Sequence, residues 1–491
     1  MSGRVGYANF TPAIKPFMKN YNYTFLLSIS LVAALGGLLF GYDWVVIGGA
    51  KPFYELYFGI ANSPALQGWA MSSALVGCVA GAAVAGKLAD TYGRRPLLIA
   101  AAVLFSLSAL GTGASHAFTA FIIWRIIGGV GIGIASTISP LYIAEIAPQE
   151  TRGLFVSINQ LTVVIGILGA QITNMLITDA IPDGFTPEQI LASWNGQTGW
   201  RYMFWAGLLP ALLFFVLMFL IPESPRYLAK KGAYKKAEGT LAKIGGLAYA
   251  EKAIQSIRET FTTGEAKKTD IKMLLDRKAL SILTIGIVLA AFQQWCGINI
   301  IFNYAQEIFV SAGYSINDLF MNIVITGSIN LVFTIVAMGT VDKLGRKKLM
   351  LIGSGGLAVI YAVMGYFYYA HVTGLPLLLL VLLAIAIYAM SLAPIVWVIL
   401  SEIFPNRIRG VAMSIATFAL WIASALLVQT FPFFNQYLGT SGTFWVYGII
   451  CALGFVFVLK RLPETKNKSL EEIEELLLND KLNDKKTTTK I

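Results

Sequence analysis

Cysteine and charge are both scarce in this chain of 491 residues, which has 3 cysteines and 13% charged residues. The cysteines, Cys78, Cys296 and Cys451, all lie inside apolar segments. That setting suits small packing residues better than a disulfide framework, a metal site or a nucleophile. Because an ordinary soluble domain carries about 25% charged residues, this composition, with 56% hydrophobic residues, predicts a polytopic membrane protein.

Several functional signatures are missing as well. The sequence has no Walker motif, which argues against ATP-driven pumping, and no nucleophile, base and orienting group that would indicate an enzyme. Nothing resembles a channel filter or a ring of pore-lining charges. The first apolar run follows a polar, basic leader without a small-residue cleavage pattern, so we expect no cleavable signal peptide.

The net charge of +11 could indicate a nucleic-acid partner, but the placement of the basic residues argues against one. They gather in alternate loops, which is the positive-inside bias of inner or plasma membrane proteins. With the basic loops inside, both termini are cytoplasmic. We therefore expect a multi-pass protein of the plasma membrane, of the bacterial inner-membrane type, surrounded by lipid and without an obligate protein partner.

Twelve apolar runs of about twenty residues are each long enough to span a bilayer. They predict an all-α integral membrane protein with two six-helix halves. The runs lie at about 24–48, 66–89, 97–114, 117–143, 154–177, 200–221, 279–303, 319–341, 348–370, 376–400, 411–433 and 443–460. The expected parts are a cytoplasmic leader (1–22), an N-terminal half (23–221), a cytoplasmic helical linker (222–278), a C-terminal half (279–461) and a cytoplasmic tail (462–491).

The two halves repeat each other in sequence. LADTYGRRP at 88–96 is similar to TVDKLGRKK at 340–348. AEIAPQETRG, which ends at Gly153, matches SEIFPNRIRG, which ends at Gly410. PESPR at 222–226 is similar to PETKN at 463–467. Three motif pairs in one order and at nearly one offset predict a duplicated six-span unit. Two such halves imply a cargo site at their interface near mid-membrane, reached by alternating access.

These motifs resemble those of the sugar porter family of the major facilitator superfamily over roughly residues 23–475. The Asp-x-x-Gly-Arg loops at 90–95 and 342–347 carry the likeness together with PESPR, PETK, WRIIGG at 124–129 and QQWCGIN at 293–299. Within the family the chain is most similar to bacterial proton-linked xylose transporters and then to facilitative glucose transporters. The resemblance implies a monosaccharide as cargo and a proton as the coupling ion, with no cofactor and no metal.

Asp43 is the single formal charge in the apolar, glycine-rich stretch 31–50. A carboxylate there costs about 2.5–3.5 kcal/mol on insertion scales, so we expect a partner, a water-filled cavity or a proton to carry. At ~1.5 Å rise per residue, helix ends at Lys51 and near Ala117 would put Asp43 and Arg125 both about 12–13 Å deep. The resemblance implies that Asp43 takes the proton and Arg125 is its partner, whereas facilitators usually carry Asn there. A static ion pair is the alternative.

The cargo site is expected to be neutral and rich in amides, because a sugar offers only hydroxyls and a side-chain amide both donates and accepts. On one helix, Gln293 and Gln294 would point about 100° apart, with Asn299 on the side of Gln294. An interhelical hydrogen bond is the alternative role for any single amide. The candidate residues are Gln160, Gln293, Gln294, Asn299 and Asn330, with Phe40, Trp397 and Trp421 as aromatic walls.

Three residues depart from the family pattern. Asn303 stands where the xylose and glucose transporters have Tyr, Leu420 stands where the xylose transporters have Gln, and Trp44 is bulkier than the small residue expected beside Asp43. Xylose, glucose, galactose, fructose and arabinose therefore all remain open as cargo.

The charged motifs of the expected cytoplasmic side imply, by resemblance, an inside gate that latches the outward-facing state. Its residues are Asp90, Arg94, Glu145, Arg152, Glu223 and Arg226, and Asp342, Arg346, Glu402 and Arg409 in the second half. Topology alone, through the positive-inside bias, is the alternative role.

Glycine and proline punctuate several spans. The glycines of 128–133 are expected to pack span four closely against a neighbour. Pro394 interrupts span ten before Trp397, so the inner end of that span is expected to bend over the cargo.

The sequence thus predicts a secondary transporter that brings a neutral monosaccharide, a hexose or a pentose, into the cell with a proton. A proton-independent facilitative uniporter is the alternative within this class. A non-transporting sugar sensor is the alternative outside it, although such sensors typically carry long cytoplasmic extensions.

Overall fold

The computed structural model describes residues 21–148, 151–182, 184–262, 277–404 and 409–466, and in these residues all the regular structure is helical. Most of the predicted tail and part of the linker therefore lie outside the described residues. The helices are α1 (Tyr23–Tyr57), α2 (Pro64–Tyr92), α3 (Arg94–Ala114), α4 (Phe118–Ile146), α5 (Arg152–Ile177), α6 (Pro187–Ala192), the π-helix η1 (Asn195–Gly199), α7 (Trp200–Ala206), α8 (Leu208–Met218), α9 (Pro225–Lys230), α10 (Tyr234–Gly245), α11 (Leu247–Thr262), α12 (Arg277–Trp295), α13 (Ile298–Asn303), α14 (Ala305–Ser311), α15 (Ile316–Leu344), α16 (Arg346–Tyr369), α17 (Leu375–Met390), α18 (Leu392–Ile403) and α19 (Arg409–Arg461).

Eleven helical stretches in the described residues are long and apolar enough to cross a membrane. The last of them, in α19, is two helices joined at Gly439, whose φ of 66° and ψ of 176° are not helical. Glycine suits this position because it adopts positive φ without a steric penalty. The stretch thus supplies two crossings, and the predicted count of twelve is confirmed.

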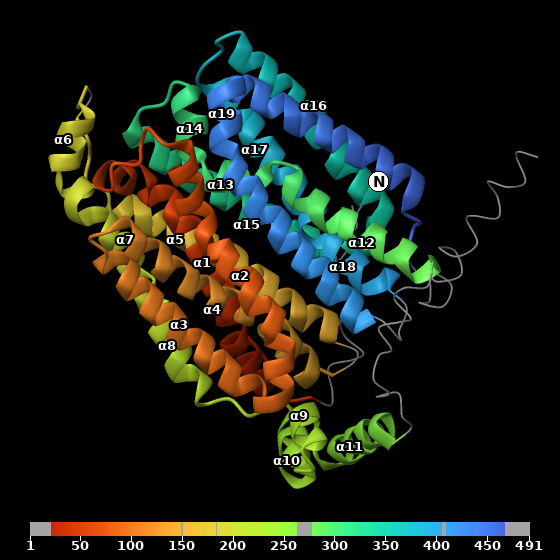
Figure 1. The fold of residues 1–491 in the computed structure, drawn as a ribbon. Coiled ribbons are helices and arrows are strands. Elements are labelled where there is room, and N and C mark those ends of the chain that lie inside the picture. The colour runs from red at the N-terminus through yellow and green to blue at the C-terminus, as the bar shows by residue number, and fades with distance from the viewer. Residues whose placement is uncertain (1–20, 149–150, 183, 263–276, 405–408, 467–491) are drawn as a thin grey trace, which may run out of the picture.

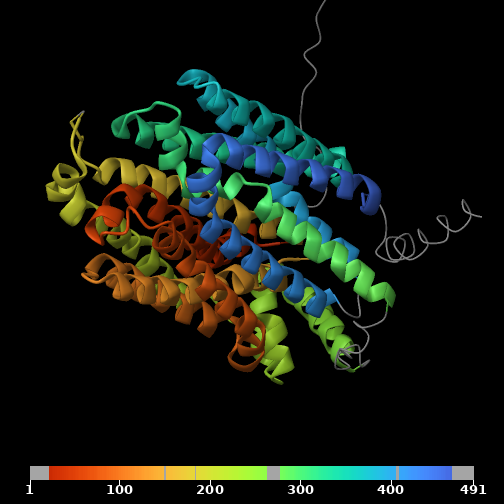
Figure 2. The same cartoon turned by 45° about the horizontal axis from the view of Figure 1, so that its top comes forward.

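The two halves lie side by side, with α1–α8 in one and α12–α19 in the other (Figure 1), and the view in Figure 2 shows the same division. The helices α9–α11 lie at one end of the bundle, which we call the linker end; the opposite end is the far end. A small apolar core of Ala237, Leu241, Ala250 and Ile254 holds α10 and α11 together. The backbone N–H of Asn22 donates to the carbonyl oxygen of Ile244 at 2.7 Å, which ties the start of α1 to α10.

Two crossings are broken inside the membrane-length stretch, spans seven and ten. Gly297, with φ 87°, separates α12 from α13, whereas Gly207, between α7 and α8, keeps helical backbone angles (φ −62°, ψ −17°). Span ten breaks at Ser391, between α17 and α18. Pro394 accounts for that break, because its ring excludes the carbonyl of residue 390 and removes an N–H. Broken helices in transporters commonly surround a binding site.

Helices of the two halves contact each other at the far end. Ser72 of α2 donates its hydroxyl to Gln429 of α19 at 2.7 Å, and the Gln429 amide donates to the carbonyl oxygen of Ala65 at 3.3 Å. Phe53 of α1 stacks on Phe320 of α15, with ring centroids 6.5 Å apart. The far end is therefore closed in this structure.

Close packing of α2 on α4 confirms the expectation for the glycines of span four. A Cβ placed on Gly129 would lie 1.9 Å from the carbonyl oxygen of Ala74, which is backbone and cannot move aside. Small residues of this kind let membrane helices approach each other closely.

Replacing Gly129 with Ala is expected to destabilise the protein by about 1–3 kcal/mol or more, because the added methyl forces α2 away from α4. The melting temperature of the purified protein in detergent measures the loss. Gly169→Ala is the matched control, since a Cβ at Gly169 meets nothing within 4 Å. Equal melting temperatures for the two variants would contradict this account of the packing.

Candidate functional site

Asp43 of α1 and Arg125 of α4 form a buried ion pair. An Nη1 hydrogen of Arg125 is donated to Oδ1 of Asp43 at 2.8 Å, and the side chains are 2% and 17% exposed. The second oxygen, Oδ2, is buried and accepts no hydrogen bond from the described residues. The guanidinium also lies 5.7 Å from the ring centroid of Phe204. The Asp43 carboxylate is thus held by one ion pair, through Oδ1, and its Oδ2 atom is left without a hydrogen-bond donor among the described residues.

Two small cavities adjoin the Asp43 carboxylate. One, of about 10 Å³, is lined by residues of both halves: Asp43, Trp44, Met71, Ala74, Leu75, Arg125, Ile132 and Asn303. The other, of about 20 Å³, lies within the N-terminal half and is lined by Leu39, Tyr42, Asp43, Val46, Phe105, Ser108, Ala109, Thr112, Phe204 and Gly207. A water needs about 10–15 Å³ of such volume, so each cavity has room for about one.

The contact of Asp43 with Arg125 agrees with the prediction from the sequence. The helix end at Lys51, from which the depth of Asp43 in the membrane was estimated, was wrong. The helix α1 continues past Lys51 to Tyr57, with Pro52 inside it. Lys51 followed by Pro52 has the pattern of a helix end at a membrane surface, yet Lys51 is only 2% exposed and has acidic partners. One of these partners, Glu55, lies one turn further along the same helix, whereas the other, Glu307 of α14, cannot be inferred from the sequence of α1.

The amides of span seven form a connected cluster. Nδ2 of Asn299 donates to Oε1 of Gln294 at 2.5 Å, and Nε2 of Gln294 donates to Oε1 of Gln293 at 3.3 Å. The Gln293 amide also donates to the carbonyl oxygen of Ala393 at 3.1 Å, next to the break between α17 and α18. The cluster therefore joins the broken ends of two crossings. Asn299 lies on the side of Gln294, as expected, although the two residues stand on separate helices, α13 and α12.

An aromatic cluster bridges the two halves beside the Asp43 pair. The ring centroid of Phe40 lies 5.7 Å from that of Trp44 and 5.6 Å from that of Trp421, and Trp44 lies 6.1 Å from Trp421. The indole N–H of Trp421 is buried and has no hydrogen-bond partner in the described part of the chain. Two of the expected aromatic walls, Phe40 and Trp421, are thus in contact, and Trp44, the neighbour of Asp43 in the sequence, contacts both.

Among the described residues, no hydrogen bond or ring contact joins three of the expected sugar-binding residues to these clusters. Gln160 is half-buried, Asn330 is 5% exposed and Trp397 is 37% exposed. Their role as cargo contacts stays a prediction.

The three departures from the family pattern all lie near the pair or the aromatic cluster. Asn303 lines the smaller cavity and donates its amide to the backbone carbonyl oxygen of Asn299 at 2.9 Å, so α13 contributes to the wall of the cavity beside Asp43. Leu420 is buried at 3% exposure, directly before Trp421. Trp44 lines the same cavity as Asn303.

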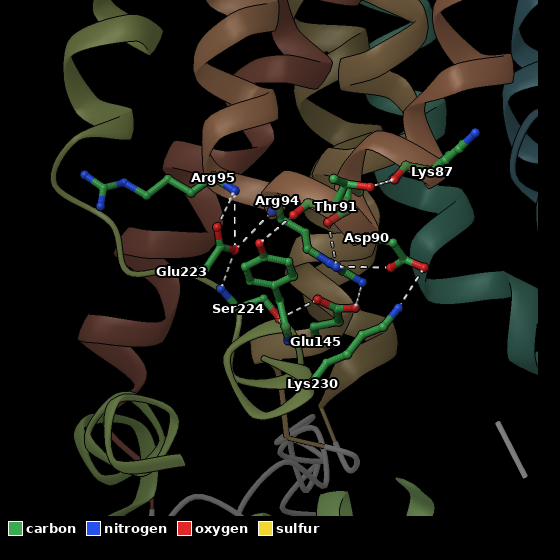
Figure 3. A network of polar contacts seen from close by, with 11 residues as sticks. Lys87, Asp90, Thr91, Arg94, Arg95, Glu145, Glu223, Ser224 and Lys230 are labelled. Carbon is green, nitrogen blue, oxygen red and sulfur yellow. Dashed lines mark hydrogen bonds and ion pairs between the residues drawn. The ribbon is translucent and has the colours of Figure 1, made fainter. Parts of the chain in front are cut away.

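The charged motifs of the N-terminal half meet at the linker end of α2, α3 and α4 (Figure 3). Arg94 donates to Glu145 at 2.9 Å and lies 3.4 Å from Asp90, which also pairs with Lys230 at 3.0 Å. Ser224 donates its hydroxyl to the other oxygen of Glu145. These contacts join the loop between α2 and α3 to α4 and to the start of α9.

Glu223 caps the start of α3. Its carboxylate accepts from the backbone N–H of Arg94 at 3.1 Å and of Arg95 at 3.2 Å, where the dipole of α3 favours negative charge. Burial raises the pKa of this carboxyl, although those backbone donors and Arg94 oppose the shift. The loop turns at Gly93, whose φ of 103° suits glycine.

The C-terminal half repeats this arrangement. Glu464 accepts from the backbone N–H of Arg346 at 2.9 Å and of Lys347 at 3.1 Å, and Glu402 accepts from the Arg346 guanidinium at 3.1 Å. Thr465 donates to Glu402 at 2.6 Å, as Ser224 does to Glu145. Glu464 was missed as a site residue, although the echo of PESPR in PETKN marks it.

Not every predicted gate residue takes part in these networks. Arg152 and Arg226 are exposed, and the side chains of Asp342 and Arg409 lie outside those that the structure describes. The ion pairs given above for Arg94 and Arg346 each stay within one half. The idea that these residues latch the outward-facing state stays a prediction.

The chain is similar to known proteins over most of its length. A family model described as "Sugar (and other) transporter" matches residues 29–477. The D-xylose-proton symporter of Escherichia coli is 40% identical over 93% of this chain and 96% of the relative. The arabinose-proton symporter of Bacillus subtilis is 38% identical over 94% and 97%, and the glucose facilitated diffusion protein of Zymomonas mobilis is 33% identical over 92% and 98%.

The fold is also similar to solved structures. A structure of the xylose transporter XylE from Escherichia coli, in an inward open conformation, matches with a TM-score of 0.80 and 38% identity, over 92% of this chain and 99% of that one. A partially occluded inward open form matches with a TM-score of 0.78 over 90% and 100%.

Proposed function

The chain belongs to the sugar transporter family of the major facilitator superfamily, and from that membership we propose that it imports a neutral monosaccharide together with a proton. In this proposal the linker end and both termini face the cytoplasm of a bacterial inner membrane. The relatives named as proton symporters for xylose and arabinose support the reaction class. The positive-inside bias supports the orientation.

The Asp43–Arg125 pair carries the proposal for proton coupling. A buried carboxylate is costly in a membrane, and this one keeps an oxygen without a hydrogen-bond donor beside two cavities of the size of a water. A proton that reaches Oδ2 removes the charge and weakens the attraction to Arg125. A facilitator has no need of such a group, although a facilitated-diffusion relative exists.

The aromatic cluster links this protonation to the cargo site. Trp44 follows Asp43 in α1 and contacts Trp421 of the other half. Asn303 lines the smaller cavity and is bonded to the backbone of Asn299 in the same helix, α13. Movement of α1 on protonation would therefore reach the groups proposed to bind the sugar. The amides of Gln293, Gln294 and Asn299 suit hydroxyls, because each can donate and accept.

Transport in liposomes tests this function. With the purified protein reconstituted and the outside made more acid by one pH unit, we expect the internal concentration of the cargo sugar to exceed the external one, up to about tenfold for one proton. The sugar is first chosen by a binding screen of neutral hexoses and pentoses on the solubilised protein. Equal uptake with and without the gradient would favour the facilitator, and binding of only charged solutes would exclude a neutral amide site.

A further inference from the structure

A second group of buried charges lies at the far end, away from the Asp43 pair. Lys51 of α1 is 2% exposed and contacts two carboxylates: Glu55, one turn further along α1 at 3.0 Å, and Glu307 of α14. Its ammonium group also lies 5.5 Å from the ring centroid of Tyr304. We call Lys51, Glu55 and Glu307 the Lys51 cluster.

The two carboxylates of the cluster differ in where they are attached. Glu55 shares a helix with Lys51, whereas Glu307 belongs to the opposite half. Any opening of the far end that separates the halves moves α14 away from α1. It therefore breaks the contact of Lys51 with Glu307 and leaves the contact with Glu55 intact.

A buried ammonium group that loses its only partner is strongly destabilising, because its desolvation is no longer compensated. Glu55 compensates the charge of Lys51 in both states, since it lies on the same helix and stays beside Lys51 when the far end opens. Glu307 in contrast stabilises only the closed far end. Lys51 is thus paired with Glu55 in every state and with Glu307 only when the far end is closed.

We propose that the Lys51 cluster is the far-end gate of the transport cycle, with Glu307 as the latch across the halves and Glu55 as the partner that keeps Lys51 compensated when the latch opens. This rests on the alternating access of the proposed function. It assigns positioning roles to three residues that neither cargo nor coupling proton needs to touch. The position of α14 makes the latch relevant to cargo, because α14 directly follows α13, which carries Asn299 and Asn303.

Two substitutions that remove the same charge should then act in opposite directions. Glu307→Gln weakens the closed state alone and favours the open far end. Glu55→Gln leaves Lys51 without a partner in the open state and favours the closed one. A merely structural role for the cluster would move both variants in the same direction.

The test measures access to the far end in nanodiscs, without sugar or a pH gradient. A cysteine is introduced at Ser72, which is 2% exposed and bonded to Gln429 of the other half, and its reaction with a bulky maleimide is timed. The chain without this change is the blank, because its three cysteines are buried. We expect labelling to become faster by about tenfold in Glu307→Gln and slower by about tenfold in Glu55→Gln.

The exposed Glu188, in the connection between α5 and α7 at the same end, supplies the control Glu188→Gln, which should label as the parent does. If either glutamine variant fails to fold, Glu307→Asp or Glu55→Asp should shift labelling the same way by less, since the shorter side chain weakens the contact. Unchanged rates, or shifts of one sign in both variants, would overturn the latch. Because no sugar is present, a failure of the proposed symport would leave this result unaffected, and the two proposals fail separately.

Discussion

Asp43→Asn is expected to abolish proton-driven accumulation of the sugar while exchange of sugar across the membrane continues. The amide keeps the shape of the carboxylate, and it still accepts a hydrogen bond from Arg125 at the position of Oδ1. It cannot take up and release a proton, so a gradient of one pH unit, worth about 1.4 kcal/mol per proton, no longer drives uptake. The internal to external ratio of sugar should fall from as much as about tenfold to about one.

Two measurements on the same liposomes separate coupling from binding. Accumulation under an imposed pH gradient reports the coupled reaction, and counterflow of labelled sugar against an internal unlabelled pool reports exchange alone. Asp318→Asn is the matched control, because Asp318 is exposed at the start of α15. Accumulation by Asp43→Asn equal to that of the parent would remove Asp43 from the proton pathway.

Gln294→Ala is expected to weaken sugar binding by about tenfold or more. Gln294 lies at the centre of the amide cluster, where it donates to Gln293 and accepts from Asn299. Its loss removes its own hydrogen bonds to the sugar, at about 0.5–1.5 kcal/mol each, and leaves the Asn299 amide without its orienting partner. Two such losses correspond to about tenfold or more in the dissociation constant.

Titration calorimetry on the solubilised protein measures that constant directly. Gln67→Ala is the control, since Gln67 is half-buried at the start of α2, where its amide donates to the carbonyl oxygen of Ala61. An affinity unchanged by Gln294→Ala would mean that the amide cluster only fastens α12 to the break between α17 and α18. The prediction therefore decides between cargo contact and the interhelical hydrogen bond that any buried amide can make.

The crossings and the contacts within one motif could be predicted from the sequence, because apolar length and short-range spacing determine them. The twelve crossings follow from such local rules. The spacing also placed Asn299 on the side of Gln294, although the single helix assumed for both residues is broken at Gly297. The break in span seven does not follow from such rules, since a glycine in an apolar run gives no sign of whether the chain turns there. Pro394 gave such a sign, and the break lies three residues before it, at Ser391.

Contacts between the halves were the hardest to predict. Lys51 has the pattern of a membrane-surface lysine, and only the arrival of α14 from the other half explains its burial. Conversely, Gln160, Asn330 and Trp397 fit a sugar site by residue type, but no contact joins them to the amides in this closed far-end state. When a protein has several conformations a few kcal/mol apart, its side chains have different neighbours in each conformation. The sequence pattern of one helix does not specify which of these conformations a structure will show.

The capping carboxylates Glu223 and Glu464 have a consequence for motion. Each comes from the segment that follows the last crossing of its own half, and each fastens the sharp corner at Gly93 or Gly345 in that same half. The corner between the second and third crossings is thereby bonded to the segment after the last crossing, so each half should turn as a rigid body. Almost all the conformational change of the molecule then takes place at the interface between the halves. A substitution at that interface changes the rate of movement of one half against the other rather than the stability of either half.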